Sequence, residues 1–284
     1  MMTALKLKKH ETFYIRDGWF EKALNTIKEN EQRNIFFKND GVKYLGIGAN
    51  MVKGLKYWLK AAGMINEKDN SLTEEAEIIL DKDKYLGEDF TWFFIHYKLV
   101  SNKEECPVFN AVFNSGINAF GKADMLDYLT DYLKQIDAKV NPKSIDADLG
   151  VLISSYVHEG INDNPEDNYR CPLSVLKLIK KDKNNYRMEK PKYTALSYLI
   201  VYYALSQLFE DAESFVIEES MDLEDSPVKI FNLDKYTYLQ YLDDMRKAGL
   251  VRINKTAGLN TVYFEEPRLT VKDIFDRGLG GKGR

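Results

Sequence analysis

The chain has 284 residues, and cysteine, histidine and excess positive charge are all scarce in it. It contains only two cysteines, Cys106 and Cys171, which excludes a disulfide-rich secreted domain and favours a reducing, cytoplasmic location. The formal net charge of -4 excludes broad, charge-driven affinity for nucleic acid. Any DNA-binding surface must therefore be a local basic patch on a slightly acidic protein.

Long apolar runs are scarce as well. The most apolar stretch, residues 193–209, contains two serines and a glutamine, and it lies at the short limit for a membrane span. We expect it to be a buried core helix. The N-terminus carries lysines but no apolar core of the kind a secretory signal has. The sequence thus predicts a cytoplasmic protein that does not enter the membrane.

The residues that are abundant favour a folded, mainly helical protein. A hydrophobic fraction of 44% and an aromatic fraction of 13% exclude a wholly disordered chain. We expect two winged-helix-like modules, each with a short β-hairpin wing, on either side of a helical middle region. The predicted divisions are an N-terminal module at 1–87, a helical middle domain at 88–185, a C-terminal module at 186–275 and a disordered tail at 276–284.

Helical periodicity defines the first module. Apolar residues recur at helical spacing from Trp19 to Ile27, with Asp17 as the candidate N-cap. A short helix fits NDGVKYLG, and a third helix follows in LGIGANMVKGLKYWLKAAGMI. Gly63 ends that helix as a C-cap glycine would. A turn-rich hairpin position comes next, and then a helix capped by Ser71 or Thr73.

An internal repeat supports the two-module interpretation. The segment Ala62-Gly63-Met64-Ile65 aligns with Ala248-Gly249-Leu250-Val251, and the helices before them align without a gap. Each copy ends in Ala-Gly followed by two apolar residues that can enter a strand. In the second copy, LVRIN and NTVYFEE flank the turn-like KTAGL. This order, a helix followed by a hairpin, is typical of a winged-helix domain.

The N-terminal copy also resembles the bacterial helix-turn-helix pattern. Leu45, Val52, Leu59 and Ile65 fall at its core positions. Lysine can contact phosphate or guanine, and asparagine can read adenine. We expect the helix to present to DNA the residues Ala49, Asn50, Lys53, Gly54, Tyr57 and Lys60, with Lys56 on the flank. Lys53, Lys56 and Lys60 would contact phosphate, and Asn50 and Tyr57 would lie near base edges.

The C-terminal copy is less suited to DNA. Its helix carries Asp243 and Asp244, which would repel phosphate. Basic residues gather where the helix ends and in the wing, and of these Arg252 and Lys255 are the candidates for contact with phosphate. We favour packing or partner docking as the role of this copy.

No catalytic centre is evident. The histidines His10, His96 and His158 are scattered, and no second ligand stands at metal spacing from them. A site could combine His158 and Cys171 with the acidic residues between them, Glu159, Asp163, Glu166 and Asp167, but a solvated acidic loop beside a buried thiol is favoured. Glutamates next to Cys106 oppose a nucleophilic role. The glycine-rich tail lacks the strand and helix of a phosphate loop. We expect no enzyme activity, metal or cofactor.

Three stretches carry a family resemblance: HETFYIRDGWFEKAL, LGIGANMVKGLKYWLKAAGMI and EDNYRCPLSVLKLI. They resemble a bacterial domain-of-unknown-function family, number 4007, over nearly the whole chain. The most specific parts are Gly46 to Val52 and Asp167 to Leu173. The resemblance implies a gene context of DNA phosphorothioation and phage-defence islands, beside phosphosulfate-reductase-like proteins. It provides no catalytic residues.

Two functions therefore compete. The first is a non-enzymatic DNA-binding component of a DNA-modification or phage-defence system, working with protein partners of that system. It predicts salt-sensitive duplex binding. The second is an adaptor that docks a reductase-like or helicase-like partner without touching DNA, through its aromatic-rich middle and its acidic C-terminal helix.

Overall fold

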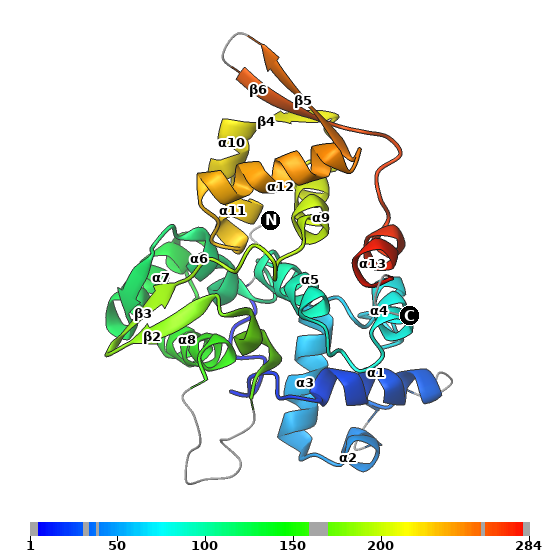
Figure 1. Ribbon diagram of the computed structural model, residues 1–284. Coiled ribbons are helices and arrows are strands. Elements are labelled where there is room, and N and C mark those ends of the chain that lie inside the picture. The colour runs from blue at the N-terminus through cyan, green and yellow to red at the C-terminus, as the bar shows by residue number, and fades with distance from the viewer. Residues whose placement is uncertain (1–4, 31–33, 38–39, 159–169, 257–258, 281–284) are drawn as a thin grey trace.

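The computed structural model describes residues 5–30, 34–37, 40–158, 170–256 and 259–280, and their fold is mainly helical with small antiparallel sheets. The N-terminal helices lie at one end of the molecule and the C-terminal hairpin at the other (Figure 1). Within the described residues, no helix has both the length and the apolarity needed to cross a bilayer.

The N-terminal part is a helical unit closed by a very short hairpin. It consists of α1 (Trp19–Glu29), α2 (Asp40–Leu45), α3 (Ala49–Ala61) and α4 (Glu74–Lys82). One antiparallel bridge, Ile65 to Leu72, forms the hairpin. Thr73 caps α4 as predicted, because its hydroxyl accepts from the Ala76 amide. The prediction of Asp17 as the cap of α1 is wrong: Gly18 precedes the helix in the left-handed conformation, with no side-chain cap.

The middle part contains a three-stranded sheet in addition to the expected helices. Its elements are α5 (Asp89–Val100), α6 (Pro107–Asn114), β1 (Ala119–Gly121), α7 (Lys122–Ile136), α8 (Pro142–Tyr156), the 3-10 helix η2 (Pro172–Leu176), β2 (Ile179–Asp182) and β3 (Asn185–Met188). The strands form an antiparallel sheet in the order β1-β3-β2. The boundary expected after residue 185 falls inside β3. These strands have three or four residues, which is too short for alternation to reveal them.

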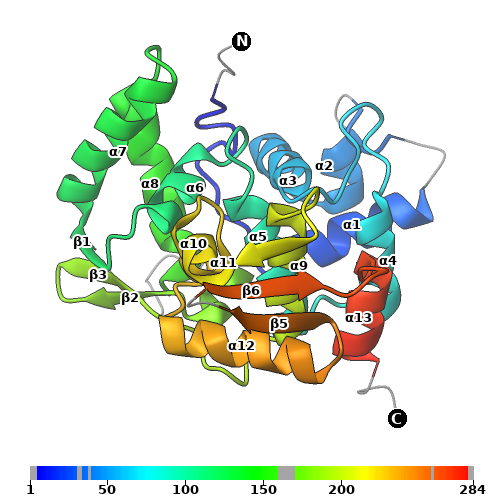
Figure 2. The same cartoon turned by 90° about the horizontal axis from the view of Figure 1, so that it is seen from above.

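The C-terminal part repeats this topology. It consists of α9 (Tyr198–Leu208), β4 (Ser214–Val216), α10 (Ile217–Asp222), α11 (Pro227–Ile230), α12 (Lys235–Lys247), β5 (Val251–Thr256), β6 (Leu259–Phe264) and α13 (Val271–Leu279). The sheet order is β4-β6-β5. Both parts therefore run helix, strand, helices, hairpin, and the last strand lies between the other two. Figure 2 shows the β5–β6 hairpin lying along α12.

The predicted repeat is present in the backbone. The Met64 amide donates to the Leu59 carbonyl at 2.8 Å, and the Leu250 amide donates to the Met245 carbonyl at 2.9 Å. In both copies the intervening glycine is left-handed, with φ near 70°. These are the bonds of a Schellman helix end, which requires a residue that tolerates positive φ. The same turn thus directs each helix into its hairpin.

Two helices form the centre of the core. Every residue of α5 except Asp89 and Lys98 is buried, and residues 199–206 of α9 are all buried. The prediction of a buried core helix within residues 193–209 is therefore confirmed. The aromatic side chains of α5 and α6 are buried too. Because these aromatic residues form the core, they cannot serve as the docking surface that the adaptor hypothesis assigns to the middle region.

The expected disordered tail from residue 276 is wrong for the residues that are described. The helix α13 continues to Leu279, which is buried, and it lies beside α4 in both views. The Phe275 ring contacts the rings of Phe90 and Phe94, each with centroids 5.2 Å apart. The sequence did not predict this helix, because its apolar residues lie next to the glycine-rich end of the chain. Residues 281–284 lie outside the described residues.

Candidate nucleic-acid interface

The helix α3 buries one side and exposes another. Leu55, Trp58 and Leu59 are almost fully buried. Lys53, exposed, and Lys56 and Lys60, half-buried, lie at positions i, i+3 and i+7, which places their side chains on one stripe of the helix. We call these three residues the lysine stripe. The exposed Asn50 lies one turn before it and accepts a hydrogen bond from the Lys53 ammonium at 3.3 Å.

The charges of the lysine stripe are not neutralised. The Lys56 ammonium lies 5.6 Å from the centre of the Phe36 ring, and the Lys60 ammonium donates to the Glu67 carbonyl at 3.0 Å. Among the described residues, no carboxylate comes within ion-pair distance of any of the three. Burial and the charge of Lys60 lower the pKa of Lys56. An anion that contacted the stripe would relieve this repulsion between lysines.

The expectation that Tyr57 and Gly54 face DNA is wrong. The Tyr57 hydroxyl points into the protein, donates to the Glu105 carbonyl and lies 3.5 Å from the Cys106 sulfur. A Cβ atom on Gly54 would lie 2.8 Å from the His10 carbonyl oxygen. Glycine is needed there because the N-terminal segment, the chain before α1, crosses α3 at His10, where the two backbones are in direct contact. Local sequence patterns do not predict this crossing, since it joins residues more than 40 positions apart.

Polar contacts hold the N-terminal segment in place. His10 stacks on Trp58 with ring centres 5.5 Å apart. Its Nδ1 accepts from the Thr12 amide at 3.1 Å, and its Nε2 lies 2.9 Å from the Asp148 carboxylate of α8. That carboxylate also accepts from the Lys8 amide at 3.0 Å. One flank of α3 is therefore covered by firmly held chain, and the lysine stripe remains open.

The C-terminal candidates are different in character. The exposed Arg252 lies over the Tyr263 ring at 5.0 Å and 3.6 Å from the Glu265 carboxylate. Lys255 belongs to β5, and its side chain lies outside what the structure describes. On α12, the Asp243 carboxylate pairs with Arg246 and Lys247 at 2.8 and 2.7 Å. Charge on this face is largely balanced within the protein.

The candidate nucleophiles and metal ligands are not arranged for chemistry. Burial raises the pKa of both Cys106 and Cys171 to about 12, so the thiols stay protonated. For Cys106, burial raises the pKa more than the charge of the neighbouring Glu105 does. His158 is exposed, and the acidic residues Glu159, Asp163, Glu166 and Asp167 lie outside the described residues. Within the described part, no three His, Cys, Asp or Glu side chains gather as a metal site would need.

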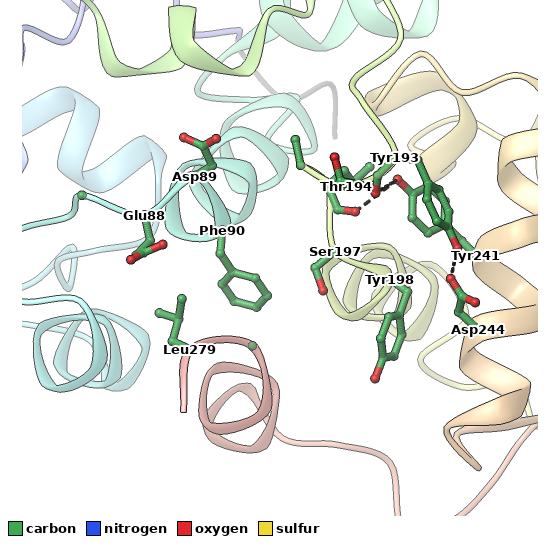
Figure 3. A pocket seen from close by; sticks show the side chains of 14 residues that line it. Glu88, Asp89, Phe90, Tyr193, Thr194, Ser197, Tyr198, Tyr241, Asp244 and Leu279 are labelled. Carbon is green, nitrogen blue, oxygen red and sulfur yellow. Dashed lines mark hydrogen bonds between the residues drawn. The ribbon is translucent and has the colours of Figure 1, made fainter. Parts of the chain in front are cut away.

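A separate pocket of about 560 Å³ lies between α5, α9, α12 and α13. Figure 3 shows Glu88 and Asp89 on one side, and Tyr193, Tyr241 and Asp244 on the other. The two tyrosine rings stack with centres 5.0 Å apart, and the Tyr193 hydroxyl donates to Asp244, which raises its pKa to about 12. Carboxylates on both sides, Glu88 and Asp89 on one and Asp244 on the other, make this pocket unsuitable for phosphate. The lysine stripe is the better nucleic-acid candidate.

Comparison with known proteins provides the family and the fold. The family model described as "Protein of unknown function (DUF4007)" matches residues 7–277. No curated protein matches the chain. Two solved structures are similar, both with a TM-score of 0.84 and 21% identity. "SspB crystal structure" aligns over 100% of this chain and 91% of its own, and "Magnesium ion-bound SspB crystal structure" over 98% and 89%. At this identity, the likeness shows a shared fold only.

Proposed function

This chain belongs to the DUF4007 family, and we propose that it is a non-enzymatic DNA-binding component of a bacterial DNA-modification or phage-defence system. In this proposal, the N-terminal and C-terminal parts are winged-helix modules. The first contacts duplex DNA through α3. The observation that carries the proposal is the lysine stripe, with three neighbouring ammonium groups and no carboxylate partner among the described residues.

The proposed binding mode is contact with the DNA backbone and little reading of bases. Lysine is a point-charge donor suited to phosphate oxygens, and phosphate contacts position a protein without specifying sequence. The residues that could approach base edges are reduced to Asn50, because Tyr57 and Gly54 are covered. We therefore expect affinity to fall steeply with salt and to change little with DNA sequence.

Charge reversal of the stripe tests the proposal. The full-length variant K53E/K56E/K60E should bind a 30-base-pair duplex at least roughly tenfold more weakly at low salt, because it removes three phosphate contacts. The slope of log affinity against log salt should fall by about 3, since each contact contributes about 0.9. Fluorescence anisotropy over a salt series measures both quantities.

The matched control is K235E/K247E/K272E. It changes the net charge by the same amount, at lysines that already face carboxylates. It should keep most of the wild-type affinity. Equal losses of affinity in both triple variants would mean that the effect comes from the net charge and not from the position of the lysines. Unchanged binding in the stripe variant would reject α3 as the DNA-contacting element.

A second candidate function, protein docking, is favoured by the outer face of α12. Tyr236 and Leu239 are 70% and 38% exposed there. Between α12 and the wing, a groove of about 630 Å³ is lined by Ile217, Leu239, Leu242, Asp243, Arg246, Ile253 and Asn260. Exposed apolar groups beside a mixed polar rim are typical of protein interfaces. This adaptor would hold a reductase-like or helicase-like protein of the same system.

Substitution of an exposed apolar residue that lines the groove tests docking. L239R should abolish co-purification of the chain with proteins encoded beside it, because it replaces an apolar contact with a larger, charged side chain that the interface would have to desolvate. Y85A, at another tyrosine that is 70% exposed, is the control. Co-purification that survives L239R would remove this groove as the docking surface.

A further inference from the structure

The β2–β3 hairpin and the residues beside it carry a dense basic run. Residues 177–190 contain six basic side chains and two acidic ones, in a protein whose net charge is -4. Lys177, Lys180, Lys183 and Arg187 are all exposed. Among the described residues, only Arg187 of these four has an ion-pair partner, the Glu189 carboxylate at 2.6 Å. The hairpin is therefore a local positive surface.

The strand register brings like charges together. Lys180 is paired directly with Arg187, so both side chains emerge from one face of the hairpin. Lys181 and Tyr186 emerge from the other face, where the Tyr186 ring packs at 5.6 Å from Phe120 of β1. Like charges in directly opposed positions destabilise a strand pair. Glu189 offsets part of the charge of Arg187, and a bound anion on this face would reduce the repulsion that remains.

The position of the hairpin matches its charge. It follows α7 and α8 as the β5–β6 hairpin follows α10 to α12, and both sheets have the same strand order. Lys183 stands at the two-residue turn, at the tip of the hairpin. A projecting basic hairpin after a pair of helices can lie along a DNA backbone as a wing does.

We propose that the β2–β3 hairpin is a second phosphate-binding element, which holds the backbone of duplex DNA through Lys180, Lys183 and Arg187. This inference rests on the proposed function, since it assumes that the chain binds duplex DNA. It adds a contact from the middle part of the molecule to the one from α3. The other role for such lysines is protection of the edge strand β2 from pairing with another chain.

The test is charge reversal within the hairpin of the full chain. K180E/K183E should bind a 30-base-pair duplex at least roughly fivefold more weakly, with the salt slope lowered by about 2. The melting temperature should not fall, because K180E places a carboxylate opposite Arg187. The control K134E/K139E makes the same charge change on exposed residues of the α7 end, and it should alter affinity less than twofold.

The outcomes separate this inference from the proposed function. If K180E/K183E binds like wild type while K53E/K56E/K60E does not, the hairpin proposal is overturned and the α3 proposal stands. If only the hairpin variant loses affinity, the hairpin is the DNA-binding element and α3 is not. Unchanged affinity together with new aggregation would assign the lysines to edge protection. Wild-type protein without duplex affinity would overturn both proposals.

Discussion

His96 lies fully buried where three parts of the chain meet. Its Nε2 donates to the Ile230 carbonyl of α11 at 2.9 Å, and its Nδ1 accepts from the Tyr156 hydroxyl of α8 at 2.6 Å. The ring also packs against Phe113 and Phe231. Since a neutral imidazole satisfies both partners, this histidine is a structural residue. Burial lowers its pKa to about 4.

This pKa predicts a pH dependence of stability. The unfolded chain protonates His96 near pH 6.5, whereas the folded chain resists protonation until about pH 4. The unfolded state therefore binds more protons between these values, and lowering the pH through this window destabilises the fold. We expect His96 to contribute a loss of about 2 kcal/mol between pH 7.5 and 5. Urea unfolding at the two pH values measures it.

Two variants test whether His96 causes this loss of stability at low pH. H96Q should be less stable at pH 7.5, because it disturbs two buried hydrogen bonds, but it should lack this part of the pH dependence. H158Q, at an exposed histidine, should keep the wild-type dependence. If H96Q showed the same loss between the two pH values as wild type, His96 would not be the group that titrates.

At the scale of elements, the sequence predicted those that carry strong local patterns. The α2–α3 pair, α12 and its hairpin follow from apolar periodicity and from the repeated Ala-Gly end. The sheet of the middle part escaped, because its strands are short and β2 contains three charged residues in a row. Its high density of lysine was visible in the sequence, and a search for local charge would have found it.

The candidate site was predictable on one flank of α3 only. Helical spacing predicted Lys53 and Lys60 on the outward side of α3 with Lys56 on its flank, and the three side chains share one stripe because that arrangement depends on the helix alone. It could not place Tyr57, whose environment is set by Glu105 and by the N-terminal segment. Helical spacing distinguishes the sides of a helix, but it does not predict which side a distant segment of the chain will cover.

At the scale of the whole molecule, the buried apolar side chains form one continuous cluster from Ile15 to Leu279. The helix α13 closes it by returning the end of the described chain to α4 and α5 of the N-terminal half. Phe275 is fully buried, and the Asp276 carboxylate next to it pairs with Lys82 of α4 at 2.7 Å. The halves of the sequence thus share a core, and we expect them to unfold together.

F275A tests this cooperativity. Removing a buried phenylalanine from the core costs about 3–5 kcal/mol, and we expect circular dichroism during urea unfolding to show that loss as one transition shifted to lower denaturant. Tryptophan fluorescence reports on the N-terminal half, because all three tryptophans, Trp19, Trp58 and Trp92, lie there. It should give the same midpoint as circular dichroism, because the two halves share one core. Y85A, at an exposed site, should unfold like wild type. Different midpoints from the two probes would mean that the C-terminal part loosens alone, and that α13 is an attachment to the N-terminal core and not part of it.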